Sequence, residues 1–131
     1  YGISKNKDII KKIDDISVPW NINVMAERAA IVALDEKEYI DDTIEYIEDE
    51  KNFLFHELSK IEQIKVFKPE VNFIMFKTKE FIDLKEKMLS ENIIIRSCGN
   101  YKGLDRNYYR IAVRTRVENE KFISTLKNII K

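Results

Sequence analysis

The chain has 131 residues, of which 44% are hydrophobic and 35% charged, with only three glycines and two prolines, a composition that excludes disorder and predicts one globular domain over residues 1–131. Its 23 basic and 23 acidic residues cancel, so the total charge gives no reason to expect a nucleic acid as the partner. A single cysteine excludes an intrachain disulfide, and no apolar run approaches the ~20 residues that cross a bilayer, so we expect a soluble cytoplasmic protein without a membrane partner.

The first half of the chain is predicted to be helical. Isoleucines at helical spacing favour a short helix over residues 6–16. An alanine-rich run over residues 24–34 favours a second helix, which its small residues predict to be well buried. Over residues 36–59, apolar residues recur at steps of three, four or seven and acidic residues occupy the other positions. This pattern predicts a long amphipathic helix with a solvated acidic face.

The second half is predicted to alternate between strands and helices. A helix is expected over residues 79–92, and short strands are expected at 64–67, 72–77, 93–96 and 108–114. Thr115 and Glu118 have the spacing of a capping box, which predicts that the last helix begins at this point. The expected fold class is therefore α+β: a small, mostly antiparallel sheet of about four strands, with helices packed on one face.

Two arginines stand where the last two predicted strands face each other. In the segment YYRIAVR, strand alternation places Tyr109, Ile111 and Val113 toward the core and Arg110 on the opposite face. If the two strands are antiparallel neighbours, Arg96 and Arg110 meet at the same end. Arginine binds carboxylate or phosphate bidentately and keeps its charge, so this pair is a candidate site for a small dianion. The alternative is two exposed arginines in surface salt bridges, each contributing ~0–1 kcal/mol.

Other reactive residues point to no catalytic or metal site. Cys98 has no histidine in reach by sequence, so we expect an incidental loop cysteine. His56 lies in the long helix without a second ligand at helical spacing, so we expect it at the surface. We therefore assign no catalytic residue and no metal ligand to this chain.

Seven segments, in this order along the chain, carry a resemblance to a known family: YGI, NKDIIKKI, VPWNIN, VNFIMF, IIIRSCGNYKGL, YYRIAVRT and ENEKFISTLK. They resemble the C-terminal third of pyridoxal-phosphate enzymes of aminotransferase fold type I, and they cover essentially the whole chain. The branch that they resemble contains histidinol-phosphate aminotransferase and L-threonine-phosphate decarboxylase of cobalamin biosynthesis. The resemblance implies the fold of the small domain of these enzymes.

The resemblance also implies roles for the two arginines. The family arginine that matches Arg110 binds the α-carboxylate of the substrate, and the one that matches Arg96 helps to hold its phosphate. The aminotransferases more often have a VGT-like ending where this chain has Val113, Arg114 and Thr115, and this departure favours the decarboxylase branch. We therefore expect a substrate-binding domain of L-threonine-O-phosphate decarboxylase, with histidinol-phosphate aminotransferase of histidine biosynthesis as the alternative.

The cofactor machinery of the family has no match in this sequence. A pyridoxal enzyme needs a lysine for the cofactor aldehyde, an acid for the pyridine nitrogen and a phosphate cup, and none can be matched here. The chain begins at Tyr1-Gly2, which looks like the tail of the family element that follows the Schiff-base lysine. The resemblance thus implies a homodimeric parent whose pyridoxal-phosphate domain lies upstream. We expect this fragment alone to bind no cofactor and to be inactive.

Two classes without catalysis stay as distant alternatives. The strand YYRIAVR has the tyrosines and arginines of a single-stranded nucleic-acid platform, but the sequence pI of about 6.8 disfavours it. A protein interaction module built on the helix at 36–59 is the other alternative, and its seam of about three heptads is interrupted by Lys51. An upstream sequence with a Ser-x-x-Lys segment would favour the enzyme over both.

Overall fold

The structure is a computed structural model that describes residues 3–18 and 22–131. The described chain divides into two compact units, Tyr1–Tyr39 and Ile40–Lys131. The resembling residues Tyr1-Gly2 and the proline, tryptophan and asparagine at 19–21 lie outside the described residues. Within the described ranges, no helix combines the length and the apolar character needed to cross a membrane.

The first unit contains two helices where the sequence predicts them, and each has an asparagine cap at its start. Helix α1 (Lys7–Ile16) begins at Asn6, whose side chain accepts hydrogen bonds from the backbone amides of Asp8 and Ile9. Helix α2 (Val24–Asp35) begins at Asn23, whose side-chain oxygen accepts from the amide of Met25 at 2.7 Å. Asparagine at these positions satisfies amides that have no partner inside the helix.

The prediction that the second helix is well buried is wrong for this chain. No residue of α1 or α2 is buried, and α2 leaves Met25 72% and Leu34 73% exposed. An alanine-rich pattern indicates that a helix can approach a neighbour closely, but burial also requires an element that covers it. Within the first unit, no element buries the apolar sides of these two helices.

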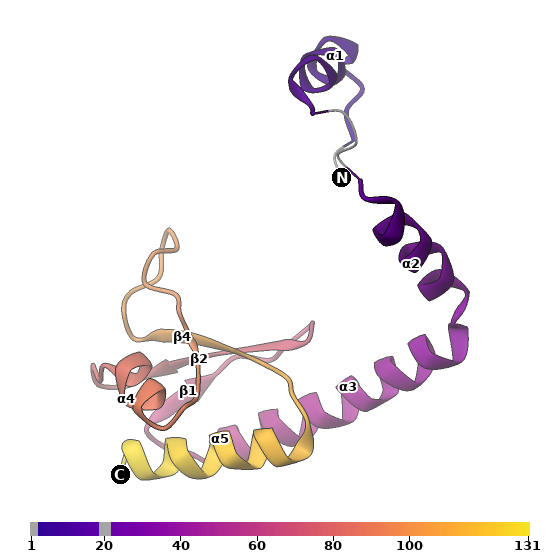
Figure 1. Cartoon of the computed structure of the whole chain (residues 1–131). Coiled ribbons are helices and arrows are strands. Elements are labelled where there is room, and N and C mark those ends of the chain that lie inside the picture. The colour runs from indigo at the N-terminus through magenta and orange to yellow at the C-terminus, as the bar shows by residue number, and fades with distance from the viewer. Residues whose placement is uncertain (1–2, 19–21) are drawn as a thin grey trace. The chain divides into compact units, whose positions relative to one another are not determined.

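The second unit has the predicted α+β fold. Its four-stranded sheet has the order β1-β2-β4-β3, with every neighbouring pair antiparallel. Figure 1 shows the sheet lying on one side of α3 and α5. The elements of this unit, in chain order, are α3 (Lys37–Ser59, beginning in the first unit), β1 (Ile64–Val66), β2 (Phe73–Thr78), α4 (Leu84–Ser90), β3 (Arg96–Ser97), β4 (Tyr108–Ala112) and α5 (Arg116–Ile129).

The core lies between the helices and one face of the sheet. Side chains of β2 and β4 alternate between buried and more exposed positions, because successive strand residues point to opposite faces. The buried residues of both strands meet apolar residues of α3, α4 and α5, and together they form one cluster: Leu54, Leu58, Ile61, Ile64, Ile74, Phe76, Leu84, Met88, Ile95, Tyr109, Ile111, Phe122, Ile123, Leu126 and Ile130. The other sheet face has no helical cover within this unit.

The structure shortens two predicted elements near the sheet edge. The strand expected at 93–96 pairs with β4 only over Arg96–Ser97, and Ile94 is 87% exposed. The helix expected over 79–92 spans only Leu84–Ser90, so Phe81, which falls within the expected range, lies outside the helix and is exposed. Three consecutive isoleucines are typical of a buried strand, but here residues 93–95 form the segment before β3 and do not pair with β4.

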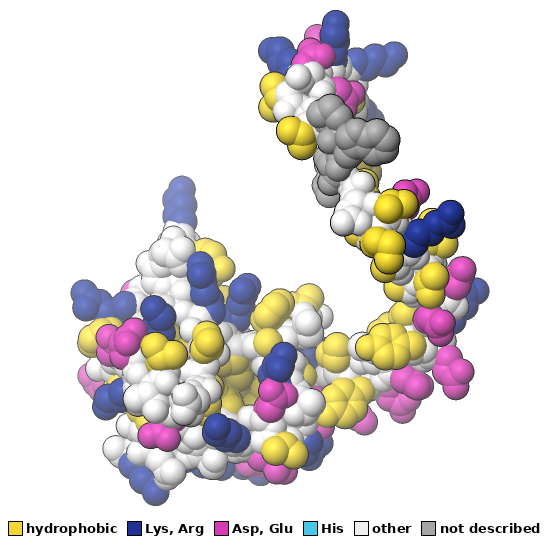
Figure 2. Space-filling view, in the orientation of Figure 1, with side chains coloured by type: hydrophobic (Ala, Val, Ile, Leu, Met, Phe, Trp, Pro, Cys, Tyr) yellow, Lys and Arg dark blue, Asp and Glu magenta, His cyan; other side chains and the backbone are white. Residues whose placement is uncertain are grey.

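The acidic face of α3 is solvated, as predicted, with one exception. Figure 2 shows acidic side chains gathered along α3, and the acids from Asp35 to Asp49 are exposed. Glu50 is buried, with an exposed fraction of 3%. Its Oε1 accepts from Nε of Arg116 at 2.8 Å, and its Oε2 accepts from Nδ2 of Asn119 at 2.9 Å. The last acid of the run therefore joins α3 to α5.

The predicted capping box at the start of α5 is confirmed. Both the backbone amide and the hydroxyl of Thr115 donate to Oε2 of Glu118, at 3.3 and 2.7 Å. The Thr115 hydroxyl and the Arg114 guanidinium lower the pKa of Glu118 to about 2. Because the folded-state pKa is lowered, this contact stabilises the helix start above the ordinary carboxyl pKa, and its contribution is lost as the pH falls toward about 2.

Thr115→Ala is expected to destabilise the chain by ~1 kcal/mol, since the substitution removes the hydroxyl that holds the Glu118 carboxylate at the start of α5. The variant should also raise the pKa of Glu118, because the Thr115 hydroxyl is the largest cause of its lowering. Urea denaturation measures the first effect and an NMR titration of the carboxyl measures the second. Ser124→Ala, which removes an exposed hydroxyl later in α5, is the control. Equal denaturation midpoints for both variants would contradict a capping role.

Candidate anion-binding site

The pairing of β3 with β4 brings the two predicted arginines together. Arg96 and Arg110 are Cα partners in the antiparallel register, and Ser97 is the partner of Tyr109. Tyr109 and Ile111 are buried in the core, so Arg110 between them points to the opposite face of the sheet. The predicted alternation of β4 and the meeting of the two arginines are therefore both confirmed as geometry.

A cavity of about 650 Å³ lies beside these two arginines. Its wall combines the end of β4, the segment that leads into β3, the loop after β3 and one lysine of α4. The lining residues are Phe73, Lys85, Ile94, Ile95, Arg96, Ser97, Gly99, Asn100, Arg110, Ile111 and Ala112. Three of them are cations and none is an acid, so the cavity favours an anionic ligand.

Neither arginine is neutralised within the described part of the chain. The ion pairs formed there involve other cations, so the alternative of two surface salt bridges does not describe Arg96 and Arg110. Their N–H donors make no hydrogen bond to the described residues. Both guanidinium groups therefore present free donors, and Arg110 does so from a half-buried position.

Aromatic rings accompany the cations on the open face of the sheet. The Arg110 guanidinium carbon lies 4.4 Å from the ring centroid of Phe73, and that of Arg96 lies 5.9 Å from the centroid of Tyr101. Lys77 lies over Tyr108 at 4.8 Å, but it also forms an ion pair with Asp105 at 3.1 Å. Contacts of this kind contribute ~0.5–1 kcal/mol at exposed sites.

Two glycines lie in the loop between β3 and β4, and both serve the conformation of the loop itself. A Cβ on Gly99 would lie 3.1 Å from Cα of Arg106, so a side chain there would press on the backbone of the loop where it returns at Arg106. Gly103 has a φ of 86°, a left-handed conformation that favours glycine. Gly99 still lines the cavity, but its lack of a side chain is explained by the closure of the loop.

The remaining reactive residues lie as the sequence predicts. His56 is exposed on α3. Cys98 lies in the loop after β3, as predicted, and is fully buried there. Burial raises the pKa of its thiol, while the positive charges of Arg110 and Arg96 act in the opposite direction. A raised pKa disfavours the reactive thiolate. No cluster of potential metal ligands occurs among residues 3–18 and 22–131.

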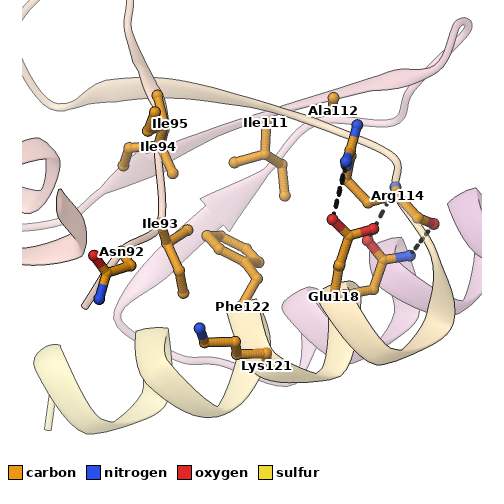
Figure 3. A pocket seen from close by; sticks show the side chains of 11 residues that line it. Asn92, Ile93, Ile94, Ile95, Ile111, Ala112, Arg114, Glu118, Lys121 and Phe122 are labelled. Atoms are coloured by element: carbon orange, nitrogen blue, oxygen red, sulfur yellow. Dashed lines mark hydrogen bonds and ion pairs between the residues drawn. The ribbon is translucent and has the colours of Figure 1, made fainter.

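A second cavity of about 530 Å³ adjoins the first and shares Ile94, Ile95, Ile111 and Ala112 with it. Figure 3 shows Arg114 at its edge, paired with Glu118, and Phe122 below Ile111. Nη2 of Arg114 lies 2.9 Å from Oε1 of Glu118. The charge of Arg114 is thereby neutralised. The second cavity is therefore less suited to bind an anion than the arginine cavity.

Sequence patterns missed two residues of the arginine cavity, Phe73 and Lys85. Phe73 begins a different strand, and only the pairing of β2 with β4 places it beside Arg110. Lys85 is an exposed residue of α4 and has the pattern of an ordinary solvated lysine. The one available signal was the alternation of β2, which places Phe73 on the face opposite to Ile74.

Comparison with known proteins gives relatives along the whole chain, although no family model matches it. A histidinol-phosphate aminotransferase of Methanosphaera stadtmanae is 32% identical over all of this chain and 36% of its own length. A threonine-phosphate decarboxylase of Salmonella typhimurium is 32% identical over 99% of this chain and 36% of its own length. The crystal structure of histidinol-phosphate aminotransferase from Clostridium acetobutylicum has a TM-score of 0.85 and 37% identity, covering 96% of this chain and 39% of that one.

The structural match identifies the fold: the α+β unit has the fold of an aminotransferase small domain. The chain spans little more than a third of the length of each relative. It belongs, as a small domain, to the fold type I pyridoxal-phosphate enzymes, in the group that includes histidinol-phosphate aminotransferases and threonine-phosphate decarboxylases. The resemblance predicted from the sequence is therefore confirmed.

Proposed function

We propose that this chain is the substrate-binding small domain of a pyridoxal-phosphate enzyme that decarboxylates L-threonine O-phosphate. The observation that carries the proposal is the direct pairing of Arg96 with Arg110 beside a cavity that no acid lines. L-Threonine O-phosphate has a carboxylate and a phosphate in one small molecule, and each is a group that an arginine fork binds bidentately. In this proposal Arg110 holds the carboxylate and Arg96 helps to hold the phosphate.

Arg114 stands where the VGT-like ending of the aminotransferases has a glycine, and this difference favours the decarboxylase branch. In this proposal Arg114 acts only indirectly. It lines the second cavity and pairs with Glu118, so its guanidinium is engaged outside the arginine cavity. Its contribution is to fix the turn that follows β4. A threonine-phosphate decarboxylase is 32% identical over 99% of this chain, which agrees with this branch without separating it from the aminotransferases.

Histidinol-phosphate aminotransferase is the second candidate, because relatives with that name match the chain equally well. Histidinol phosphate offers a phosphate and glutamate offers carboxylates, and the same two arginines suit both groups. Charge alone therefore does not separate the candidates. What separates them is the fate of the substrate carboxylate, which a decarboxylase releases and an aminotransferase retains.

The residues around the arginine cavity do not fit the cofactor itself. No carboxylate suited to the pyridine nitrogen lines this cavity in the described structure, and its lysine, Lys85, is exposed to solvent. We propose that other parts of a longer parent hold pyridoxal phosphate, that the parent is a homodimer, and that this chain alone is inactive. Stoichiometric labelling of one lysine of the 131-residue chain by pyridoxal phosphate and borohydride would contradict this part of the proposal.

The proposed reaction is tested on the full-length parent with two substrates in separate reactions. L-Threonine O-phosphate should release carbon dioxide without consuming 2-oxoglutarate, and unphosphorylated L-threonine, the matched control, should react much more slowly. Histidinol phosphate should not consume 2-oxoglutarate. Acceptor-dependent turnover of histidinol phosphate, with no carbon dioxide from L-threonine O-phosphate, would assign the parent to the aminotransferase branch.

A further inference from the structure

Arg110 is held in place by an aromatic ring rather than by an acid. Arg110 is a half-buried residue and forms no ion pair in the described structure, yet its guanidinium carbon lies 4.4 Å from the centroid of the Phe73 ring. The β2–β4 register pairs Arg110 with Met75 and Phe73 with Ala112. Phe73 is thus the diagonal neighbour of Arg110, a distance that long and aromatic side chains span. The methyl group of Ala112 leaves room beside the ring.

A contact of this kind orients the guanidinium and leaves its hydrogen-bond donors free. The guanidinium carbon lies over the ring, and a phenyl ring has no carboxylate oxygen that would take up the N–H donors. An aspartate or glutamate partner would instead occupy those donors and cancel the charge. Phe73 therefore fixes the direction of the fork without competing with an anion for it.

The two arginines differ in how firmly they are held. Arg96 is exposed and lies 5.9 Å from the Tyr101 centroid, near the ~6 Å limit for such a contact. Arg110 is less exposed and its ring is much closer. A ligand that binds at the pair meets one preoriented fork and one adjustable fork, and preorientation lowers the entropy lost on binding.

We propose that Phe73 is a positioning residue: by stacking on Arg110 it orients the fork that receives the α-carboxylate of the substrate. This inference rests on the proposed role of Arg110 and names the residue on which that role depends. The inference holds whether the parent is a decarboxylase or an aminotransferase, because L-threonine O-phosphate and glutamate both have an α-carboxylate. It also explains why a 37% exposed phenylalanine begins a strand on the face without helical cover.

The test uses the full-length parent and whichever of the two substrates, L-threonine O-phosphate or glutamate, it turns over. Phe73→Leu should raise KM by about threefold to tenfold, as expected for a lost cation–ring contact in a partly desolvated site, with a smaller change in kcat. Phe73→Tyr, which keeps the ring, should restore KM. Phe67→Leu is the matched control, because Phe67 is a second ring under a cation, Lys65, outside the cavity.

A double-mutant cycle separates positioning from a general structural role. In an Arg110→Lys background there is no planar group to orient, so Phe73→Leu should have little further effect on KM. An equal effect in both backgrounds, or a loss of thermal stability with KM unchanged, would overturn the inference. An Arg110→Lys variant with the parent KM would instead overturn the proposed function, so the two failures are distinguishable.

Discussion

Arg110→Ala in the full-length parent is expected to lower kcat/KM for L-threonine O-phosphate by about 10²-fold, because truncating one partner of a desolvated, hydrogen-bonded charge pair costs ~2–5 kcal/mol. Arg110 is half-buried, lines the cavity and has no acidic partner among the described residues. Its donors are thus available to the substrate. Arg96→Ala should have a smaller effect of about 10-fold, since Arg96 is exposed and its pairing is screened by solvent.

Arg106→Ala is the matched control for this prediction. Arg106 is a loop arginine that also lies over an aromatic ring, 4.8 Å from the centroid of Phe81, but it does not line the arginine cavity. We expect a change of less than about threefold, typical of a surface substitution. Steady-state kinetics of the three variants measure the differences. If Arg106→Ala were as damaging as Arg110→Ala, general loss of basic charge, and not the geometry of the cavity, would explain the effect.

The arrangement of Arg96 and Arg110 could be predicted from the sequence because it depends on local rules. Alternation along YYRIAVR determines which side chains share a face, and the loop between the two strands suits antiparallel neighbours. Once Tyr109 and Ile111 are in the core, Arg110 has to lie on the open face. The capping box at Thr115 and Glu118 was predictable for the same reason, since its partners are three residues apart.

The parts that the sequence did not reveal depend on contacts between distant segments. Phe73 reaches Arg110 through strand pairing, and nothing in the order of residues around Phe73 indicates a cation above its ring. Glu50 has the pattern of one more solvated acid, and its burial depends on Arg116 and Asn119, which come 66 and 69 residues later. The expected burial of α2 failed for the converse reason: composition indicates a face that can pack, but does not identify what packs on it.

The buried contacts of Glu50 form a polar network that joins α3 to the turn between β4 and α5. Asn119, 2% exposed, donates from Nδ2 to Glu50 and to the carbonyl of Arg114, both at 2.9 Å. Its Oδ1 accepts from the backbone amide of Arg114 at 3.1 Å. Arg116 donates to Glu50 and lies with its guanidinium carbon 3.7 Å from the Phe53 centroid. The network fixes the chain just after Ala112, which lines the arginine cavity.

Asn119→Ala is therefore expected to destabilise the 131-residue chain by ~3 kcal/mol. The substitution leaves the buried Glu50 carboxylate without one of its two donors, which costs ~1–3 kcal/mol. It also removes the part-buried hydrogen bonds of Asn119 to the backbone amide and carbonyl of Arg114. Asn128→Ala makes the same change at an exposed position of the same helix and should cost less than ~0.5 kcal/mol. Urea denaturation measures both variants.

A second substitution determines whether the charge of Glu50 matters or only its shape. Glu50→Gln keeps the volume and one acceptor oxygen but places an amide group where the carboxylate accepted from Arg116 or Asn119. Because one of those two donors then faces another donor, we expect a loss of ~1–2 kcal/mol, smaller than that of Asn119→Ala. Removal of Asn119 disturbs three contacts, whereas Glu50→Gln disturbs one. If Asn119→Ala and Asn128→Ala gave the same denaturation midpoint, the turn after β4 would be held by the Thr115–Glu118 box alone, and the network would not contribute to the position of Arg110.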